Sequence, residues 1–153
     1  MGNQAIAVTG VTELNAAFSR LLVSLNAATR TATSHAGHLL EREIKQTLST
    51  SSHPPGTPTP SSPGEPPSLI SGTLRRSISM QGPVPLGSGR WMAQVGPTAV
   101  YGRIQELGGS TGRGGATELP PRPFVQPAYE KLAVTGALTG LYHSAWRSAL
   151  AAH

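Results

Sequence analysis

The chain has 153 residues, a formal net charge of +5 and no cysteine, and all seven of its acidic residues are glutamate. The length fits a single domain spanning residues 1–153. The absence of cysteine excludes disulfides, a thiolate nucleophile and cysteine-ligated zinc, and the absence of aspartate removes the commonest ligands of magnesium and calcium. We therefore expect neither a metal site nor a cofactor.

The positive charge is concentrated in the middle of the chain. Between Ser68 and Thr117, Glu106 is the only acidic residue, and it stands against five arginines: Arg75, Arg76, Arg90, Arg103 and Arg113. A basic surface of this kind suggests a polyanion nearby, such as nucleic-acid phosphate. An ordinary soluble basic protein would show the same charge.

The sequence gives no sign of a membrane partner. No apolar run approaches the ~18–20 residues that cross a bilayer. The opening MGNQAIAVTG lacks the charged and apolar regions of a signal peptide. We expect a protein that is made and used in the cytosol.

The N-terminal third predicts one long amphipathic helix. Gln4–Val8 alternates as a short strand would, and Thr12 is a reasonable N-cap with Glu13 in the first turn. Apolar residues then recur every three or four positions as far as Leu48, which is the strongest periodicity in the chain. They are Leu14, Phe18, Leu21, Leu25, Ala28, Ala32, Ala36, Leu39, Ile44 and Leu48.

A continuous helix from Thr12 to Thr50 would be longer than the domain is wide. It would measure roughly 58 Å, whereas a compact domain of this length is roughly 35–40 Å across. Either the helix breaks near Thr29–Gly37, where β-branched residues and glycine lower helicity, or it projects. A projecting apolar stripe needs a partner and would indicate an oligomer.

Residues 53–67, HPPGTPTPSSPGEPP, hold half of the prolines. They exclude a helix or a central strand and predict an extended, polyproline-like loop. It is either a linker or an arm that reaches a neighbouring subunit.

The second half predicts a small antiparallel sheet and a last helix. Ser77–Gln81 and Arg90–Val95 alternate as strands, joined by the turn-rich connector Gly82–Gly89. A helical turn at Val100–Leu107 and a Gly-rich loop at 108–118 follow. A C-terminal helix starts after Pro123 or Pro127. The fold class is therefore α+β, with a long N-terminal helix, a small sheet with long loops and a C-terminal helix.

Two patterns could carry chemistry. Gly108–Gly112 matches the GxSxG pattern of serine hydrolases, with Ser110 as nucleophile, but the expected segment before it is helical, whereas the nucleophile elbow follows a strand. His35 and His38, with Glu41 one turn further, have a spacing that can bind a metal but that usually marks a solvated helix face. We expect no enzyme activity and no metal site.

Three segments in this order resemble one family. They are Ile70–Ile78 (ISGTLRRSI), then Val95–Gly96 with Tyr101–Gly108 (YGRIQELG), then Pro121–Ala128 (PRPFVQPA) ahead of the last helix. Together they look like the neck or tail-completion proteins of long-tailed double-stranded DNA bacteriophages, which are head-tail connectors or minor tail components. The segment Ala7–Leu14 is similar too. Gly102 departs from the pattern, because alanine is common there.

The resemblance implies a structural virion protein of the neck. Such proteins form a ring, expected to have six subunits, which joins the portal and head-closure proteins to the tail-terminator or tail-tube proteins. Genomic DNA passes through the lumen without sequence specificity. The protein would be assembled in the host cytoplasm and would end in the virion.

Within this interpretation the candidate residues have two roles. The expected core anchors, which fix the sheet against the helices, are Leu74, Ile78, Tyr101, Leu107 and Phe124. The expected lumen or interface charges are Arg75, Arg76, Arg103 and Arg113. A free-standing basic nucleic-acid-binding module is the alternative that the charge leaves open, and if Arg75 and Arg76 lay on a strand they would face opposite sides.

Overall fold

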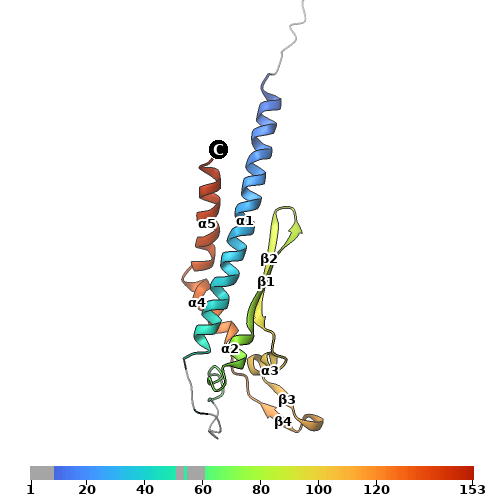
Figure 1. Ribbon diagram of the computed structural model, residues 1–153, viewed down its shortest axis with the longest axis vertical. Coiled ribbons are helices and arrows are strands. Elements are labelled where there is room, and N and C mark those ends of the chain that lie inside the picture. The colour runs from blue at the N-terminus through green and yellow to red at the C-terminus, as the bar shows by residue number, and fades with distance from the viewer. Residues whose placement is uncertain (1–8, 51–53, 55–60) are drawn as a thin grey trace, which may run out of the picture.

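The structure is a computed structural model that describes residues 9–50, 54 and 61–153. The predicted strand Gln4–Val8 lies outside the described residues, and so do residues 53 and 55–60 of the Pro-rich segment 53–67. The fold is α+β. Its long axis is a single N-terminal helix, α1, against which the other elements pack (Figure 1).

Helix α1 runs unbroken through Val11–Thr47, so it is roughly 55 Å long. The possible break at Thr29–Gly37 was wrong, because the residues that lower helicity there make packing contacts instead. The Thr29 and Thr33 hydroxyls donate to carbonyls one turn back, both at 2.8 Å, and also meet side chains of α5. Gly37 is buried against Met80 of the sheet. Thr12 is not the N-cap; Gly10 precedes the helix, at φ 85°.

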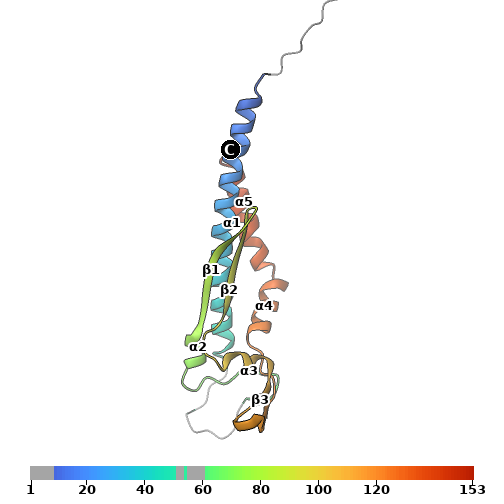
Figure 2. The same ribbon diagram turned by 90° about the vertical axis from the view of Figure 1, so that its right-hand side faces the viewer.

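Two layers flank α1. Helices α4 (Val125–Val134) and α5 (Ala137–Leu150) lie along one side, and the hairpin of β1 (Ile78–Gly87) and β2 (Arg90–Pro97) lies along the other (Figures 1 and 2). The expected C-terminal helix is thus two helices, separated at Gly136, which has a positive φ of 67°. The N-terminal end of α1 extends beyond α5 and beyond the hairpin tip.

The hairpin is longer than expected. The strands pair antiparallel from Ile78↔Pro97 to Gly87↔Arg90, so the segment predicted as a connector, Gly82–Gly89, is mostly strand. A register shift between Gln81 and Val84 absorbs the Gly82–Pro83 pair, which has a cis peptide bond. Trp91 secures the hairpin to α1, because its Nε1 donates to Asn26 Oδ1 at 2.8 Å. The Arg30 guanidinium stacks on the Trp91 ring, 5.6 Å from its centroid.

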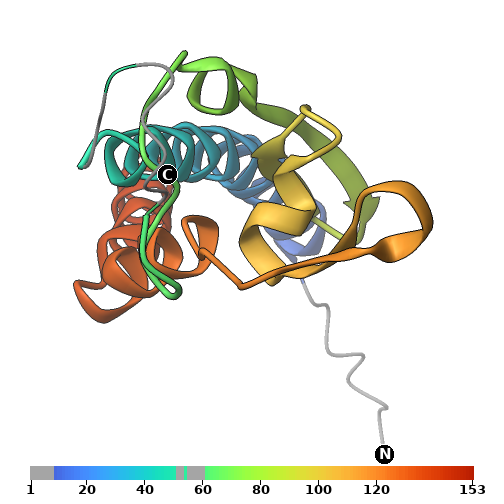
Figure 3. The ribbon, with the colours of Figure 1, turned by 90° about the horizontal axis from the view of Figure 1, so that it is seen from below.

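Short elements gather at the opposite end of the molecule from the α1 N-terminus. They are α2 (Thr73–Ser77), α3 (Gly102–Leu107), β3 (Gly109–Thr111), the 3₁₀ turn η1 (Arg113–Gly115) and β4 (Thr117–Leu119) (Figure 3). Arg75 and Arg76 therefore lie on a helix and not on a strand. The predicted Gly-rich loop is a second small hairpin, in which Gly109 pairs with Leu119.

The core lies beside the C-terminal third of α1. Ile44 and Leu48 of α1 pack with Ile78 at the start of β1 and with Phe124 and Ala128 at the start of α4. Each large apolar side chain buried here contributes roughly 1.5–3 kcal/mol to the stability.

Among the described residues, no helix combines the length and hydropathy that a membrane crossing requires.

Candidate docking site where α3 meets α4

Glu106 on α3 caps the N-terminus of α4. Its Oε2 accepts hydrogen bonds from the backbone N–H groups of Phe124 (2.7 Å) and Val125 (3.0 Å), and its Oε1 accepts one from Gln126 (3.0 Å). One carboxylate thereby satisfies three N–H groups that the helix itself leaves without partners, and its charge complements the helix dipole. The second and third segments of the family resemblance are joined through this cap.

The cap comes from a distant residue because α4 has no local one. The N-cap position is Phe124, which makes no side-chain cap hydrogen bond. This role of Glu106 was not among the predictions from the sequence. A signal was present, since the expected helix start at Pro123–Pro127 lacks Ser, Thr, Asp and Asn, the residues that usually cap helices.

Two glycines allow the close packing around this cap. A Cβ at Gly102 would lie 2.4 Å from Pro97 Cγ, so the departure to glycine at this position fits the proline ring beside it. Gly108 has φ 69°, and a Cβ there would lie 2.7 Å from the Leu119 carbonyl oxygen. Glycine at each place lets α3 sit directly against its neighbours.

Hydrogen bonds from Arg122 and Gly64 tie the described end of the Pro-rich segment to the same junction. The Arg122 N–H donates to the Gln105 carbonyl at 2.8 Å, and the Arg122 side-chain Nε donates to the Ser61 carbonyl at 3.1 Å. The Gly64 N–H donates to the Pro121 carbonyl at 2.9 Å. Residues 61–64 are therefore held by their own chain.

The junction presents an apolar groove to solvent, which we call the α3–α4 groove. It has a volume of about 720 Å³ and is lined by Pro97, Thr98, Ala99, Val100, Gly102, Arg103, Glu106, Leu107, Val125, Gln126 and Tyr129. Val100, Leu107 and Tyr129 are 98%, 64% and 52% exposed. The Glu106 carboxylate is already hydrogen-bonded to α4. Most of the other residues that line the groove are apolar. Such a surface fits a macromolecular partner better than a polar substrate.

The five predicted core anchors fall into two groups. Ile78 and Phe124 are fully buried, and Leu74 packs against the same cluster. Tyr101 and Leu107 are not core residues, which corrects the prediction. Tyr101 is 40% exposed and lines a cavity of about 250 Å³ beside Leu69 and Arg122, whereas Leu107 faces the α3–α4 groove. Helix α3 has six residues, too few turns to bury both sides.

The four predicted charge residues are all exposed but are not gathered in one place. Arg75 lies beside Arg42 and Lys45 of α1, Arg103 lines the α3–α4 groove, and Arg113 lies in η1. Arg76 is turned back on its own helix, because its guanidinium donates to the Ser71 carbonyl at 2.9 Å. It braces the start of α2.

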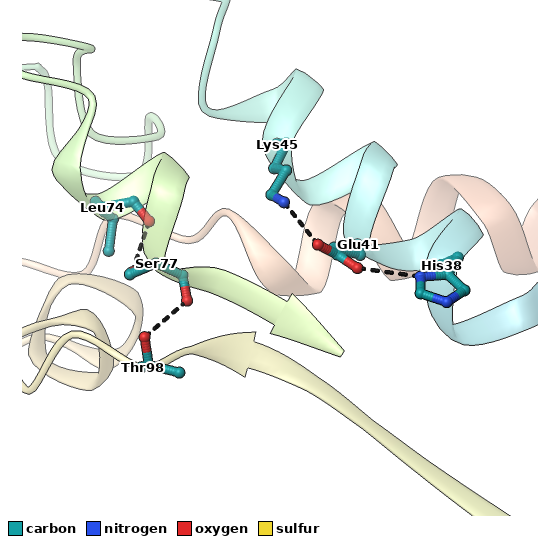
Figure 4. Close-up of polar contacts among 6 residues, drawn as sticks. All are labelled: His38, Glu41, Lys45, Leu74, Ser77 and Thr98. Carbon is teal, nitrogen blue, oxygen red and sulfur yellow. Dashed lines mark hydrogen bonds and ion pairs between the residues drawn. The ribbon is translucent and has the colours of Figure 1, made fainter. Parts of the chain in front are cut away.

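The first segment of the resemblance fixes α2 to the hairpin. The Ser77 hydroxyl donates to the Leu74 carbonyl at 2.7 Å, and the Ser77 carbonyl accepts from the Thr98 N–H (2.9 Å) and hydroxyl (3.1 Å) (Figure 4). All three segments therefore surround one end of the molecule. Their contacts position the α3–α4 groove and leave its apolar rim uncovered.

The two patterns that could carry chemistry, at Ser110 and at His35, His38 and Glu41, include side chains that make ordinary structural contacts. Ser110 lies on β3, after a helix, and donates to Glu118 of β4; this is not the strand–turn–helix arrangement of a nucleophile elbow. Glu41 pairs with Lys45 at 2.6 Å, and His38 Nδ1 lies 3.3 Å from its other oxygen (Figure 4). Hydrogen bonding from Lys45 lowers the pKa of Glu41, and His38 adds a smaller effect in the same direction.

In the part of the chain that the structure describes, no three His or Glu side chains gather as a metal site would require. Comparison of the chain with protein-family models, with curated proteins and with solved structures finds no match.

Proposed function

We propose that this protein is a structural subunit of the neck of a long-tailed bacteriophage. It forms a ring between the portal or head-closure proteins and the tail, and DNA passes through the ring. The three segments that resemble neck and tail-completion proteins support the proposal, because they lie at one end of the molecule. The Glu106 cap joins the second segment to the third, and hydrogen bonds from Thr98 to Ser77 fix the first segment to the hairpin. The proposed role is assembly rather than catalysis.

The observation that carries the proposal is the uncovered apolar surface of α1. Val11, Leu14, Phe18 and Leu22 are exposed, from 49% at Val11 to 66% at Leu22. They recur at three- and four-residue steps on one face of α1, towards its N-terminal end, which extends beyond α5 and the hairpin (Figure 2). Monomeric proteins rarely expose an apolar surface of this length, whereas a subunit of a ring covers it with a neighbour.

The exposed arginines suit a lumen or a charged interface. Arg75, Arg103 and Arg113 present guanidinium groups to solvent, which is the chemistry that contacts phosphate without reading sequence. Alanine at each of these positions should reduce ring assembly or virion infectivity, and Arg76→Ala should act mainly on folding. Unchanged assembly and infectivity in all three variants would remove the arginines from the proposed role.

The test of the proposed function is complementation. Tails assembled in a host that lacks this protein are mixed with mature heads, with and without the purified protein. The proposal predicts that joined, infectious particles form only when the protein is added. If heads and tails join equally well without it, the neck role is wrong.

A basic nucleic-acid-binding module is the second candidate. The observation that favours it is the concave surface where Arg42 and Arg75 lie beside Lys45, which is itself paired with Glu41. It predicts that the isolated protein binds DNA with an affinity that falls steeply as salt rises. Binding that is absent at low salt would exclude it.

A further inference from the structure

The apolar face of α1 that is exposed near the N-terminus is covered by α5 further along. Trp146 Nε1 donates to Thr29 Oγ1 at 2.9 Å, and Tyr142 donates to Thr33 at 3.1 Å. Thr29 lies seven residues after Leu22, so both are on the same face of the helix. The cover stops near Ser24, whose hydroxyl lies 2.8 Å from His153 Nε2. The exposed stripe, Val11–Leu22, begins where α5 ends.

The stripe can be buried without burying a charge. Glu13 and Arg20 are the charged residues of this segment, and at 3.6 residues per turn both point away from Leu14 and Phe18. Its anchors, Val11, Leu14, Phe18 and Leu22, follow the spacing by which an amphipathic helix fits an apolar groove. A helix with this stripe can therefore occupy an apolar groove on a partner.

The same chain carries such a groove at its other end. The α3–α4 groove has about 720 Å³ of open volume, and most of the residues that line it are apolar. Val100 is almost fully exposed in its lining and Leu107 is 64% exposed, and Arg103 is also exposed there, where its charged head can stay in water. Among the residues that the structure describes, none covers the apolar part of the groove or the apolar side chains of the stripe.

One molecule cannot bring the two surfaces together, because the unbroken helix α1 holds them at opposite ends (Figure 1). We propose that the Val11–Leu22 stripe of one copy docks in the α3–α4 groove of the next copy. Contact between two different surfaces is heterologous, and it builds a ring when the rotation from each copy to the next closes. This inference rests on the proposed ring and names the surfaces that form it.

The absence of cysteine allows a direct test. Two variants, Phe18→Cys and Leu107→Cys, each place one thiol on one of the two surfaces, at side chains that are already exposed. The two purified proteins are mixed and treated with a short bismaleimide, and one of them carries a size tag. A third variant, Ser148→Cys, is the matched control, because Ser148 is exposed on α5 and lies outside both surfaces.

The proposal predicts that Phe18→Cys joins Leu107→Cys in roughly tenfold or greater yield over the pairing of Ser148→Cys with Leu107→Cys, because docked thiols have an effective concentration on the order of mM. Yields equal to the control would overturn it. Stronger joining of Phe18→Cys to itself would also overturn it, since the helices would then pair with each other.

The outcomes separate this inference from the proposed function. If the wild-type protein forms rings on tail ends while the mixed product stays at the control level, the ring uses other surfaces and the neck role stands. If the mixed product forms but heads and tails join without the protein, the docking contact stands and the neck role fails.

Discussion

At the scale of single residues, Glu106 has the most consequences for the site. Its carboxylate accepts three backbone N–H groups from α4, the helix that brings Phe124 into the core. Loss of the cap would leave those groups without partners at a partly buried position. Glu106 therefore acts on the core and on the α3–α4 groove together.

Replacing Glu106 by alanine should lower the free energy of unfolding by about 1–3 kcal/mol, the usual range for a lost helix cap or for unsatisfied N–H groups. Urea unfolding followed by circular dichroism measures the change. Glu130→Ala is the control, because Glu130 is exposed on α4 and its carboxylate accepts a hydrogen bond from the Gln126 side chain, one turn back on the same helix. Equal stability of the two variants would show that the cap is dispensable.

Phe124 and Leu107 give a matched pair of apolar residues from the same junction. Phe124 is fully buried, so Phe124→Ala should cost ~3–5 kcal/mol. Leu107 is 64% exposed, so Leu107→Ala should change the stability of the monomer by less than ~1 kcal/mol. Thermal and urea unfolding of both variants provide the comparison. A loss below ~1 kcal/mol for Phe124→Ala would remove it from the core.

Glu41 should make stability depend on pH in the acid range. Lys45, and to a smaller extent His38, lower its pKa, so the folded state favours the carboxylate. The stabilisation is complete above the unfolded pKa of about 4.3 and is lost as the pH falls through the lower folded value. Melting temperatures measured across this range should fall less steeply for Glu41→Gln than for the wild type. Parallel curves for the two proteins would contradict the pairing.

At the scale of elements, the hairpin and α3 are fitted to α1 and to each other by close backbone approaches. A Cβ at Gly102 would meet the rigid ring of Pro97, whereas a Cβ at Gly140 in α5 would meet nothing within 4 Å. The two helical glycines therefore differ in what a larger residue would do at each position. Gly102 permits the close packing against Pro97, whereas Gly140 only lowers the helix propensity of α5.

Gly102→Ala should therefore destabilise the protein by about 1–3 kcal/mol, as overpacking does. Gly140→Ala should stabilise it by roughly 0.5–1 kcal/mol through helix propensity. Chemical denaturation of the two variants tests both signs at once. A stabilising Gly102→Ala would mean that Pro97 moves away at little cost.

The main helices and strands were largely predictable, because the spacing of apolar residues along the sequence indicates them. The long helix, the paired strands near 78–81 and 90–95 and the helix after Pro123 follow from spacing alone. The continuity of α1 through Thr29–Gly37 could not be foreseen, because the contacts that stabilise it come from Tyr142 and Trp146, over a hundred residues away. Tertiary contacts here override the low local helix propensity.

The candidate site was predictable only in part. The sequence marked Phe124 and Ile78 as anchors and they are buried, whereas Tyr101 and Leu107 have the same apolar character and lie at the surface. Residue type does not show which side of a six-residue helix faces the core. The role of Glu106 could not be predicted from the local sequence either, since the N–H groups that it caps lie 18 to 20 residues away.

At the scale of the whole molecule, the protein is an elongated subunit with its core at one end and an uncovered apolar helix at the other (Figure 1). The middle of α1 is sheltered by α5 and by the hairpin, so the exposed stripe does not weaken the fold. This division suits a subunit that folds before it assembles. The stripe then remains available for a neighbour, as the proposed ring requires.

The most direct test of the central claim is the mass of the particle in solution. Light scattering is recorded on the purified protein alone and again with tail tubes that lack it. The neck proposal predicts a ring, or a monomer that becomes a ring on the tail ends. A protein that stays monomeric, ignores the tails and changes mass only when DNA is added would contradict the proposal and favour the nucleic-acid-binding module.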